Sequence, residues 1–168
     1  MSRTAPDPLL ERVMREPEAP ALRARSATWT RVELLRAADG LAAALLAEGV
    51  CEGSRVACLL DDDASAVALI HALRRLGAVH VPLNRRAAPA ELRYQLELVS
   101  PALLLADRGN LARAHESVPE GLTVERIEAL LAATPCGRAP VLRTEIDLAA
   151  PATIVFTSGT TGRPKGAV

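Results

Sequence analysis

The chain has few aromatic residues and no excess of either charge. Phenylalanine, tryptophan and tyrosine make up 2% of its 168 residues, too few for the stacking platforms on which proteins bind single-stranded nucleic acids. Lysine plus arginine and aspartate plus glutamate are equal at 20 each, so no net field attracts a polyanion. Both shortages argue against a nucleic acid or an anionic membrane surface as a partner.

Cysteine, histidine and long apolar runs are also scarce. Cys51, Cys58 and Cys136 form no Cys-x-x-Cys pair, and their odd number argues against a disulfide framework. The three histidines stand at no metal-ligand spacing to a cysteine or a carboxylate. No apolar run reaches the ~18 residues that cross a bilayer, and the first residues lack the apolar core of a signal peptide. We therefore expect a cytoplasmic protein with reduced cysteines and no membrane span.

What the chain does contain is a regular alternation of two kinds of apolar pattern. Compact apolar segments at 55–60, 78–83 and 102–106 each predict a buried strand, and amphipathic patterns over 64–76 and 89–99 predict helices between them. Continuous apolar strands separated by helices imply parallel pairing, with helices covering both faces of the sheet. The predicted fold class is α/β.

The first 50 residues predict two helices around a small hairpin. Residues 9–15 have a short helical pattern, and 21–29 fit two short strands with a turn between them. Thr30 and Glu33 stand at the spacing of a capping box before a long amphipathic run. Gly49 is the expected C-cap of that helix.

Two stretches are less regular. Within 107–150 we expect a strand at 122–124, a short helix at 125–133, and a surface loop around the prolines and glycine of 135–140. The aspartates at 61–63 lie between a strand and a helix. There, we expect helix N-caps rather than metal ligands.

The last residues carry the most distinctive pattern. A short apolar strand over 152–156 leads into a loop rich in hydroxyls and glycine. Glycine lets backbone N–H groups approach a ligand closely, serine and threonine donate hydrogen bonds, and Lys165 supplies a charge for a phosphate oxygen. The candidate phosphate-binding residues are Thr157, Ser158, Gly159, Thr160, Thr161, Gly162 and Lys165.

Two other interpretations of this loop fit less well. A Walker A loop requires Ser or Thr directly after its lysine, whereas Gly166 follows Lys165. A flexible linker would share the composition, but the apolar strand before the loop and its Pro-Lys-Gly ending argue against it. A loop that closes over phosphates is favoured.

The stretch from Phe156 to Gly166 closely resembles the phosphate-loop signature of the adenylate-forming superfamily: acyl- and aryl-CoA synthetases, firefly-type luciferases and adenylation domains of peptide synthetases. The segments 28–50, 76–84 and 91–96 are similar to further landmarks in the same order. Pro82-Leu83-Asn84 and the helix after it look more like fatty-acyl-CoA and o-succinylbenzoate CoA ligases. A piece of a peptide-synthetase adenylation domain is the alternative within the family.

The resemblance implies that residues 1–168 are the incomplete N-terminal portion of an adenylation domain, without the mobile C-terminal domain. It implies ATP with Mg²⁺, whose protein ligand lies outside this chain, and a small-molecule carboxylic acid and coenzyme A as co-substrates. No catalytic residue falls within the chain, because Lys165 is not the lysine of the C-terminal domain. We expect the isolated chain to be inactive. The alternative is a non-catalytic α/β fragment that folds beside a complementing C-terminal portion.

Overall fold

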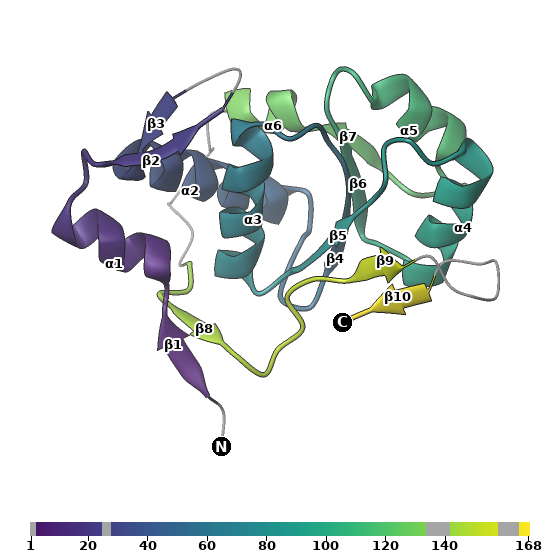
Figure 1. The fold of residues 1–168 in the computed structure, drawn as a ribbon. Helices are drawn as coiled ribbons and strands as arrows, with labels where there is room; N and C mark the ends of the chain where they lie inside the picture. Colours follow the sequence, from purple (N-terminus) through teal and green to yellow (C-terminus); the bar gives the residue numbers. More distant parts are fainter. Residues whose placement is uncertain (1–2, 25–27, 134–141, 158–164) are drawn as a thin grey trace.

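The computed structural model describes residues 3–24, 28–133, 142–157 and 165–168, and a parallel sheet lies at its centre (Figure 1). The four strands have the order β5-β4-β6-β7, and every neighbouring pair is parallel. They are β4 (Arg55–Leu59), β5 (Val79–Pro82), β6 (Leu103–Ala106) and β7 (Val124–Arg126). The predicted α/β class and its parallel pairing are confirmed.

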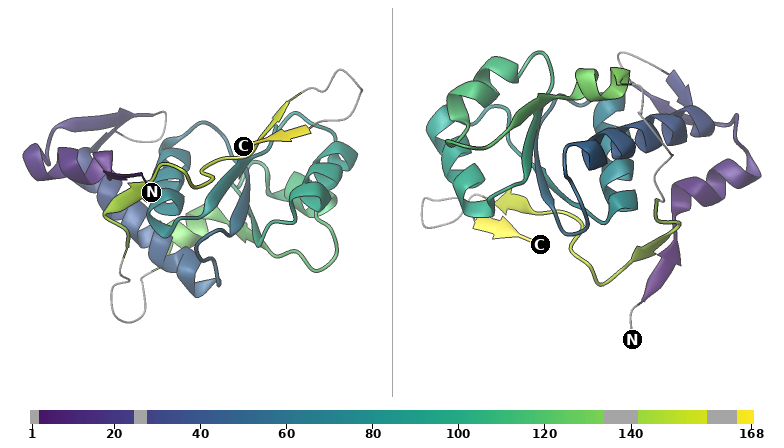
Figure 2. Two further views of the ribbon diagram at one scale, coloured as in Figure 1. Left: turned by 90° about the horizontal axis from the view of Figure 1, so that it is seen from below. Right: turned by 180° about the vertical axis from the view of Figure 1, so that it is seen from behind.

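Helices cover both faces of this sheet, as the view from below in Figure 2 shows. One face packs against α2 (Arg31–Ala47), α3 (Ala64–Leu76) and α6 (Ile127–Ala132). The other face packs against α4 (Pro89–Val99) and α5 (Leu111–Ser117). No helix in the described part of the chain is long and apolar enough to cross a membrane.

Each central strand contributes to two hydrophobic cores. Along β4, Val56 and Cys58 belong to the core beneath α2 and α3, whereas Ala57 and Leu59 belong to the core beneath α4. Successive side chains of a strand point to opposite faces, so a strand buried on both sides must be apolar throughout. This arrangement explains why the sequence predicts these strands as unbroken apolar runs.

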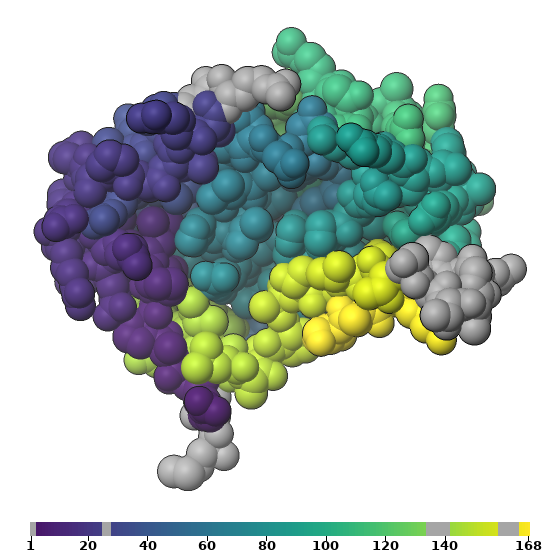
Figure 3. Space-filling model, viewed as in Figure 1, coloured from purple at the N-terminus to yellow at the C-terminus, as the bar shows by residue number. Residues whose placement is uncertain are grey.

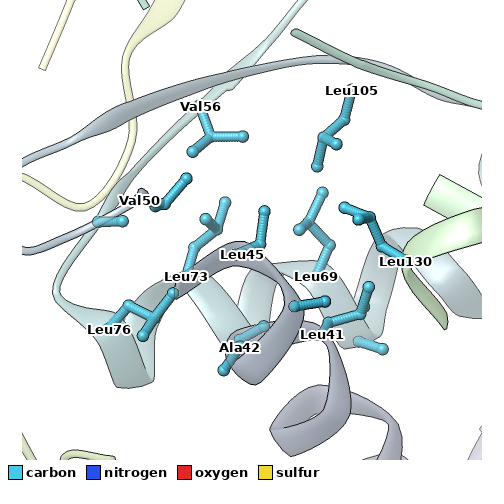
Figure 4. Packing of buried hydrophobic residues seen from close by; sticks show 14 of the residues in the cluster. Leu41, Ala42, Leu45, Val50, Val56, Leu69, Leu73, Leu76, Leu105 and Leu130 are labelled. Atoms are coloured by element: carbon cyan, nitrogen blue, oxygen red, sulfur yellow. The ribbon is translucent and has the colours of Figure 1, made fainter. Parts of the chain in front are cut away.

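The larger core lies where α2 and α3 meet the sheet. Figure 4 shows Leu69 and Leu73 of α3 and Leu45 of α2 pointing toward Val56 and Leu105 of the strands. All five side chains are at most 1% exposed. Burying each leucine contributes about 1.5–3 kcal/mol. This core holds the sheet in place against the helices on that face.

A capping box begins α2, as predicted. The Thr30 backbone N–H donates to Glu33 Oε2 over 2.7 Å, and the Glu33 N–H donates to Thr30 Oγ1 over 3.4 Å. At the other end the C-cap is Glu48, and Gly49 follows it with a φ of +82°. Gly49 therefore supplies the left-handed residue one position after the observed C-cap, and the predicted cap is off by one residue.

Replacing Thr30 with alanine is expected to lower the free energy of unfolding by about 1 kcal/mol, because the first turn of α2 loses its side-chain acceptor. Urea denaturation measures the change. Thr30→Ser is the matched control, since it retains the hydroxyl and should stay close to the unsubstituted chain. Equal losses in both variants would contradict a capping role for the hydroxyl.

The N-terminal residues form a separate layer beside α2. Helix α1 (Pro8–Arg15) is followed by β2 (Pro20–Arg23) and β3 (Thr28–Thr30), which pair antiparallel as the predicted hairpin. An unpredicted strand, β1 (Thr4–Pro6), pairs antiparallel with β8 (Glu145–Asp147). The N-terminal strand is thereby joined to the segment that leads toward the terminal hairpin (Figure 1).

The irregular middle of the chain differs from the prediction in three places. The strand expected at 122–124 is β7 at 124–126, and the helix expected at 125–133 is α6 at 127–132. Helix α5 was not predicted, because its sequence buries only Ala114 and Ser117 and so lacks an apolar stripe. The loop expected around Pro135, Gly137 and Pro140 lies outside the described residues.

Candidate functional site

The phosphate-loop candidates begin and end in a hairpin at the chain's C-terminal end. Strands β9 (Val155–Thr157) and β10 (Lys165–Ala167) pair antiparallel, with Thr157 directly opposite Lys165. Thr157 Oγ1 donates to the Lys165 carbonyl over 3.4 Å, and both residues are exposed. Ser158, Gly159, Thr160, Thr161 and Gly162 lie outside the described residues. The structure thus brings together the first and last of the predicted site residues.

Alternation of apolar side chains anchors this hairpin. Ile154 and Phe156 are partly buried and pack against the core beneath α4, while Val155 and Thr157 point to solvent. Gly166 lies opposite Phe156, and a β-carbon there would stand 3.1 Å from Ile154 Cγ2. A larger residue at 166 would have to displace that side chain. The apolar residues fix the base of the loop.

The strand expected over 152–156 joins the parallel sheet only briefly. Thr153 makes an isolated parallel bridge to His80, and the chain then leaves β5 for the two-stranded hairpin. The prediction of one strand within the sheet is therefore wrong beyond Ile154. Its physical reason is β10, which the sequence analysis treated as loop and which satisfies the backbone groups of Val155 and Thr157.

His80 provides the backbone attachment of this segment to the sheet. Its N–H donates to the Ala152 carbonyl over 3.0 Å, and its carbonyl accepts from the Ile154 N–H over 2.9 Å. The side chain is partly buried, and burial lowers the pKa of the imidazole below its usual value. Among the described residues no group of three or more histidines, cysteines or carboxylates could hold a metal ion.

A polar network at the carboxyl ends of β4 and β6 escaped the sequence analysis. The Asp61 N–H donates to Asp107 Oδ2 over 2.5 Å, and Asn110 Nδ2 donates to Asp107 Oδ1 over 2.9 Å. Arg85 forms an ion pair with Asp61, whose hydrogen bond and charge raise the pKa of the guanidinium. Carboxyl ends of parallel strands meet at one edge, a rule that could have placed Asp61 and Asp107 together.

This network also corrects the N-cap prediction for the aspartates at 61–63. Asp63 occupies the N-cap position of α3, and its carbonyl accepts from the Ala66 N–H over 3.1 Å, but its side chain makes no capping hydrogen bond. The Asp61 carboxylate instead pairs with Arg85 from the loop after β5. The network braces three loops at this edge.

Known proteins resemble this chain over nearly its whole length. A family model described as AMP-binding enzyme matches residues 9–168. The 2-succinylbenzoate–CoA ligase of Bacillus subtilis (strain 168) is 32% identical over 161 residues, which cover 96% of this chain and 32% of that protein.

Solved structures agree with the sequence comparison. The o-succinylbenzoate CoA synthetase of Bacillus subtilis, in complex with the acyl-adenylate intermediate OSB-AMP, matches with a TM-score of 0.87 at 30% identity, over 98% of this chain and 33% of that one. The same synthetase in complex with ATP and magnesium ion matches with a TM-score of 0.84 at 29% identity, over 98% of this chain and 43% of that one.

The chain spans about a third of the length of the curated relatives it matches. Its parallel sheet with helices on both faces corresponds to part of the adenylate-forming domain in those structures. The family model covers all of the described elements except β1, and it also covers the hairpin that carries Thr157 and Lys165. The chain therefore belongs to the AMP-binding enzymes, the adenylate-forming family that its last residues resemble.

Proposed function

We propose that residues 1–168 are the N-terminal part of an acid–CoA ligase, in which residues 157–165 hold the β- and γ-phosphates of ATP. The observation that carries the proposal is the hairpin β9–β10. It sets the Thr157 hydroxyl and the Lys165 residue directly opposite each other, at the two ends of the Ser, Thr and Gly loop. Hydroxyl donors and a lysine charge suit the oxygens of a polyphosphate.

The proposed chemistry has two steps. A carboxylate oxygen attacks the α-phosphorus of ATP, the bond to the bridging oxygen breaks, and pyrophosphate leaves. Coenzyme A then attacks the acyl-adenylate carbonyl through its thiol, and AMP leaves. Negative charge moves onto the pyrophosphate during the first step, so donors fixed around its oxygens stabilise the transition state more than the ground state. Thr157 and Lys165 would serve that role.

The complexes of the Bacillus subtilis synthetase with ATP and magnesium ion, and with an acyl-adenylate, support this proposal. The resemblance assigns the adenine and carboxylate pockets, the magnesium ligand and the mobile C-terminal domain to the other two-thirds of such enzymes. A peptide-synthetase adenylation domain would use the same first step. It would pass the acyl group to a carrier protein instead of coenzyme A, and an acceptor assay distinguishes the two.

Lys165 is the only lysine in the sequence, which allows a direct test of phosphate contact. An amine-directed acylating reagent can modify only this side chain and the α-amino group. We expect ATP with Mg²⁺, or pyrophosphate, to slow the modification of Lys165, because phosphate oxygens would pair with its ammonium group. Peptide mass spectrometry measures both rates, and the α-amino group is the internal control. An unchanged Lys165 rate at saturating nucleotide would contradict the proposal.

Replacing Lys165 with alanine is expected to slow adenylate formation about 10- to 150-fold, because a charge-assisted hydrogen bond contributes about 1.5–3 kcal/mol. The host is a hybrid enzyme in which residues 1–168 replace the aligned segment of the Bacillus subtilis 2-succinylbenzoate–CoA ligase. ATP/pyrophosphate exchange measures the rate. The KM for the carboxylic acid should change little, since the lysine would meet only phosphates. Lys165→Arg is the matched control and should retain part of the rate.

A further inference from the structure

We propose that His80 is a pH-sensitive attachment between the parallel sheet and the hairpin β9–β10, and that protonation of its imidazole loosens residues 152–157. If the proposed function is correct, loosening of this segment should weaken phosphate binding at acidic pH; this consequence alone rests on the proposed function. The attachment itself is a property of the described residues and can be tested without ATP.

The backbone geometry makes His80 the joint between two sheets. The parallel sheet ends at β5, and the terminal hairpin is a separate two-stranded sheet. Between them the only β-bridge of the described residues joins His80 to Thr153, through the hydrogen bonds to Ala152 and Ile154. A displacement of His80 is therefore passed directly to the strand that leads into β9.

His80 lines a small cavity of about 50 Å³ beside the same segment. Ile70 and Leu73 of α3 line the cavity on one side, and Ala152 and Thr153 line it on the other. The residue opposite His80 in β4 is Val56. The His80 side chain is partly buried here, and an outward movement of residues 152 and 153 would give solvent more access to the imidazole.

Charged groups of both signs line this cavity. Arg74 of α3 and Arg143 of the 142–153 segment both line it, together with Asp147 from β8. The Asp147 carboxylate accepts from the Ala149 N–H over 2.9 Å, and Arg143 is paired with Glu52. Among the described residues His80 forms no ion pair. Protonation would therefore create a partly buried cation that has no ion-pair partner among the described residues.

The direction of the pH effect follows from burial. Burial lowers the pKa of His80, so the folded state favours the neutral imidazole. The stabilisation is fully present above the unfolded pKa of about 6.5, and it is lost as the pH falls from there through the folded pKa. Residues 150–153 form the side of the cavity that can move, because this segment runs over the surface (Figure 3). The opposite side includes Leu73, which is buried in the larger core.

Amide hydrogen exchange of the 168-residue chain tests the inference. Protection factors, which are corrected for the intrinsic exchange rate, are measured between about pH 7.5 and pH 5, across the titration range of histidine. We expect the protection of the Ile154 N–H to fall as the pH is lowered over this range, because the folded state favours the neutral imidazole. The Leu105 N–H in the central sheet should keep its protection. An NMR titration of the His80 ring should show the same midpoint as the loss at Ile154.

Two variants separate this effect from general acid sensitivity. His80→Gln, which carries no titrating group, should abolish the pH dependence at Ile154. His71→Gln should preserve it, because His71 of α3 is also partly buried with a lowered pKa but does not line this cavity.

A pH-independent Ile154 amide, a loss that persists in His80→Gln, or a midpoint that differs from the His80 titration would each overturn the proposal. The last comparison needs no variant and so remains decisive if His80→Gln does not fold. Failure of ATP to protect Lys165 at neutral pH would contradict the proposed function and leave the exchange result unaffected.

Discussion

Asp7→Ala is expected to lower the free energy of unfolding by about 3–5 kcal/mol, the range for breaking a buried ion pair by removing one partner. Asp7 is 1% exposed and Arg75 is 7% exposed, and Arg75 Nη1 lies 3.4 Å from Asp7 Oδ2. The same carboxylate caps α1, since its Oδ1 accepts from the Leu9 N–H over 2.9 Å. The substitution would remove both interactions and leave the Arg75 guanidinium only its contact with Asp39.

Urea denaturation of matched variants separates the charge from the cap. Asp7→Asn retains a capping side chain without the charge, so its loss should be smaller than that of alanine. The double variant Asp7→Ala with Arg75→Met removes the buried cation as well and should recover part of the loss. If Asp7→Ala unfolds within about 1 kcal/mol of the unsubstituted chain, the pair does not hold the N-terminal layer.

The second prediction concerns the activity of the 168-residue chain alone. We expect it to form no acyl-CoA. Hairpin β9–β10 supplies one wall of the proposed site, and the groups that would bind adenine, the acid and magnesium are assigned to the missing two-thirds. Stabilising the transition state requires these groups to be held together. The assay uses ATP, Mg²⁺, coenzyme A and a panel of carboxylic acids, with the acyl-CoA products quantified by mass spectrometry.

The hybrid enzyme provides the positive control for that assay. It should form acyl-CoA from 2-succinylbenzoate, the substrate that names the host protein, whereas the isolated chain should not differ from a blank without protein. Turnover by the isolated chain would show that its catalytic groups lie within residues 1–168. That result would refute the proposal that the catalytic groups lie outside these residues.

The sequence predicted the elements best where a strand is buried on both faces or where hydrogen bonds are local. Strands such as β4 and β6 are covered on both faces, so an apolar run predicts them directly, and Thr30 and Glu33 specify a helix start through purely local hydrogen bonds. It was least informative where pairing joins distant residues. Strand β8 depends on β1, and Asp61 depends on Arg85. Such pairs leave no periodic signal in the residues around them.

The candidate site shows the same division. Its residue types predicted a phosphate loop, and the hairpin brings Thr157 and Lys165 together. The separate sheet was missed because its second strand, Lys-Gly-Ala, is too short and too poor in β-branched residues to resemble a strand. Residues 165–167 form a strand because they pair with β9.

The pairing of β1 with β8 also sets an order of events during synthesis on the ribosome. Each strand of the central sheet is connected to the next strand in the sequence by one helix, so β4, β5 and β6 can assemble while later residues are still being added. Residue 4 pairs with residue 147, so β1 cannot pair until residues that follow the whole central sheet in the sequence have been synthesised. Closing so long a loop is entropically costly and slow. In a nascent chain β1 therefore stays without its partner β8 until all four strands of the central sheet have been synthesised.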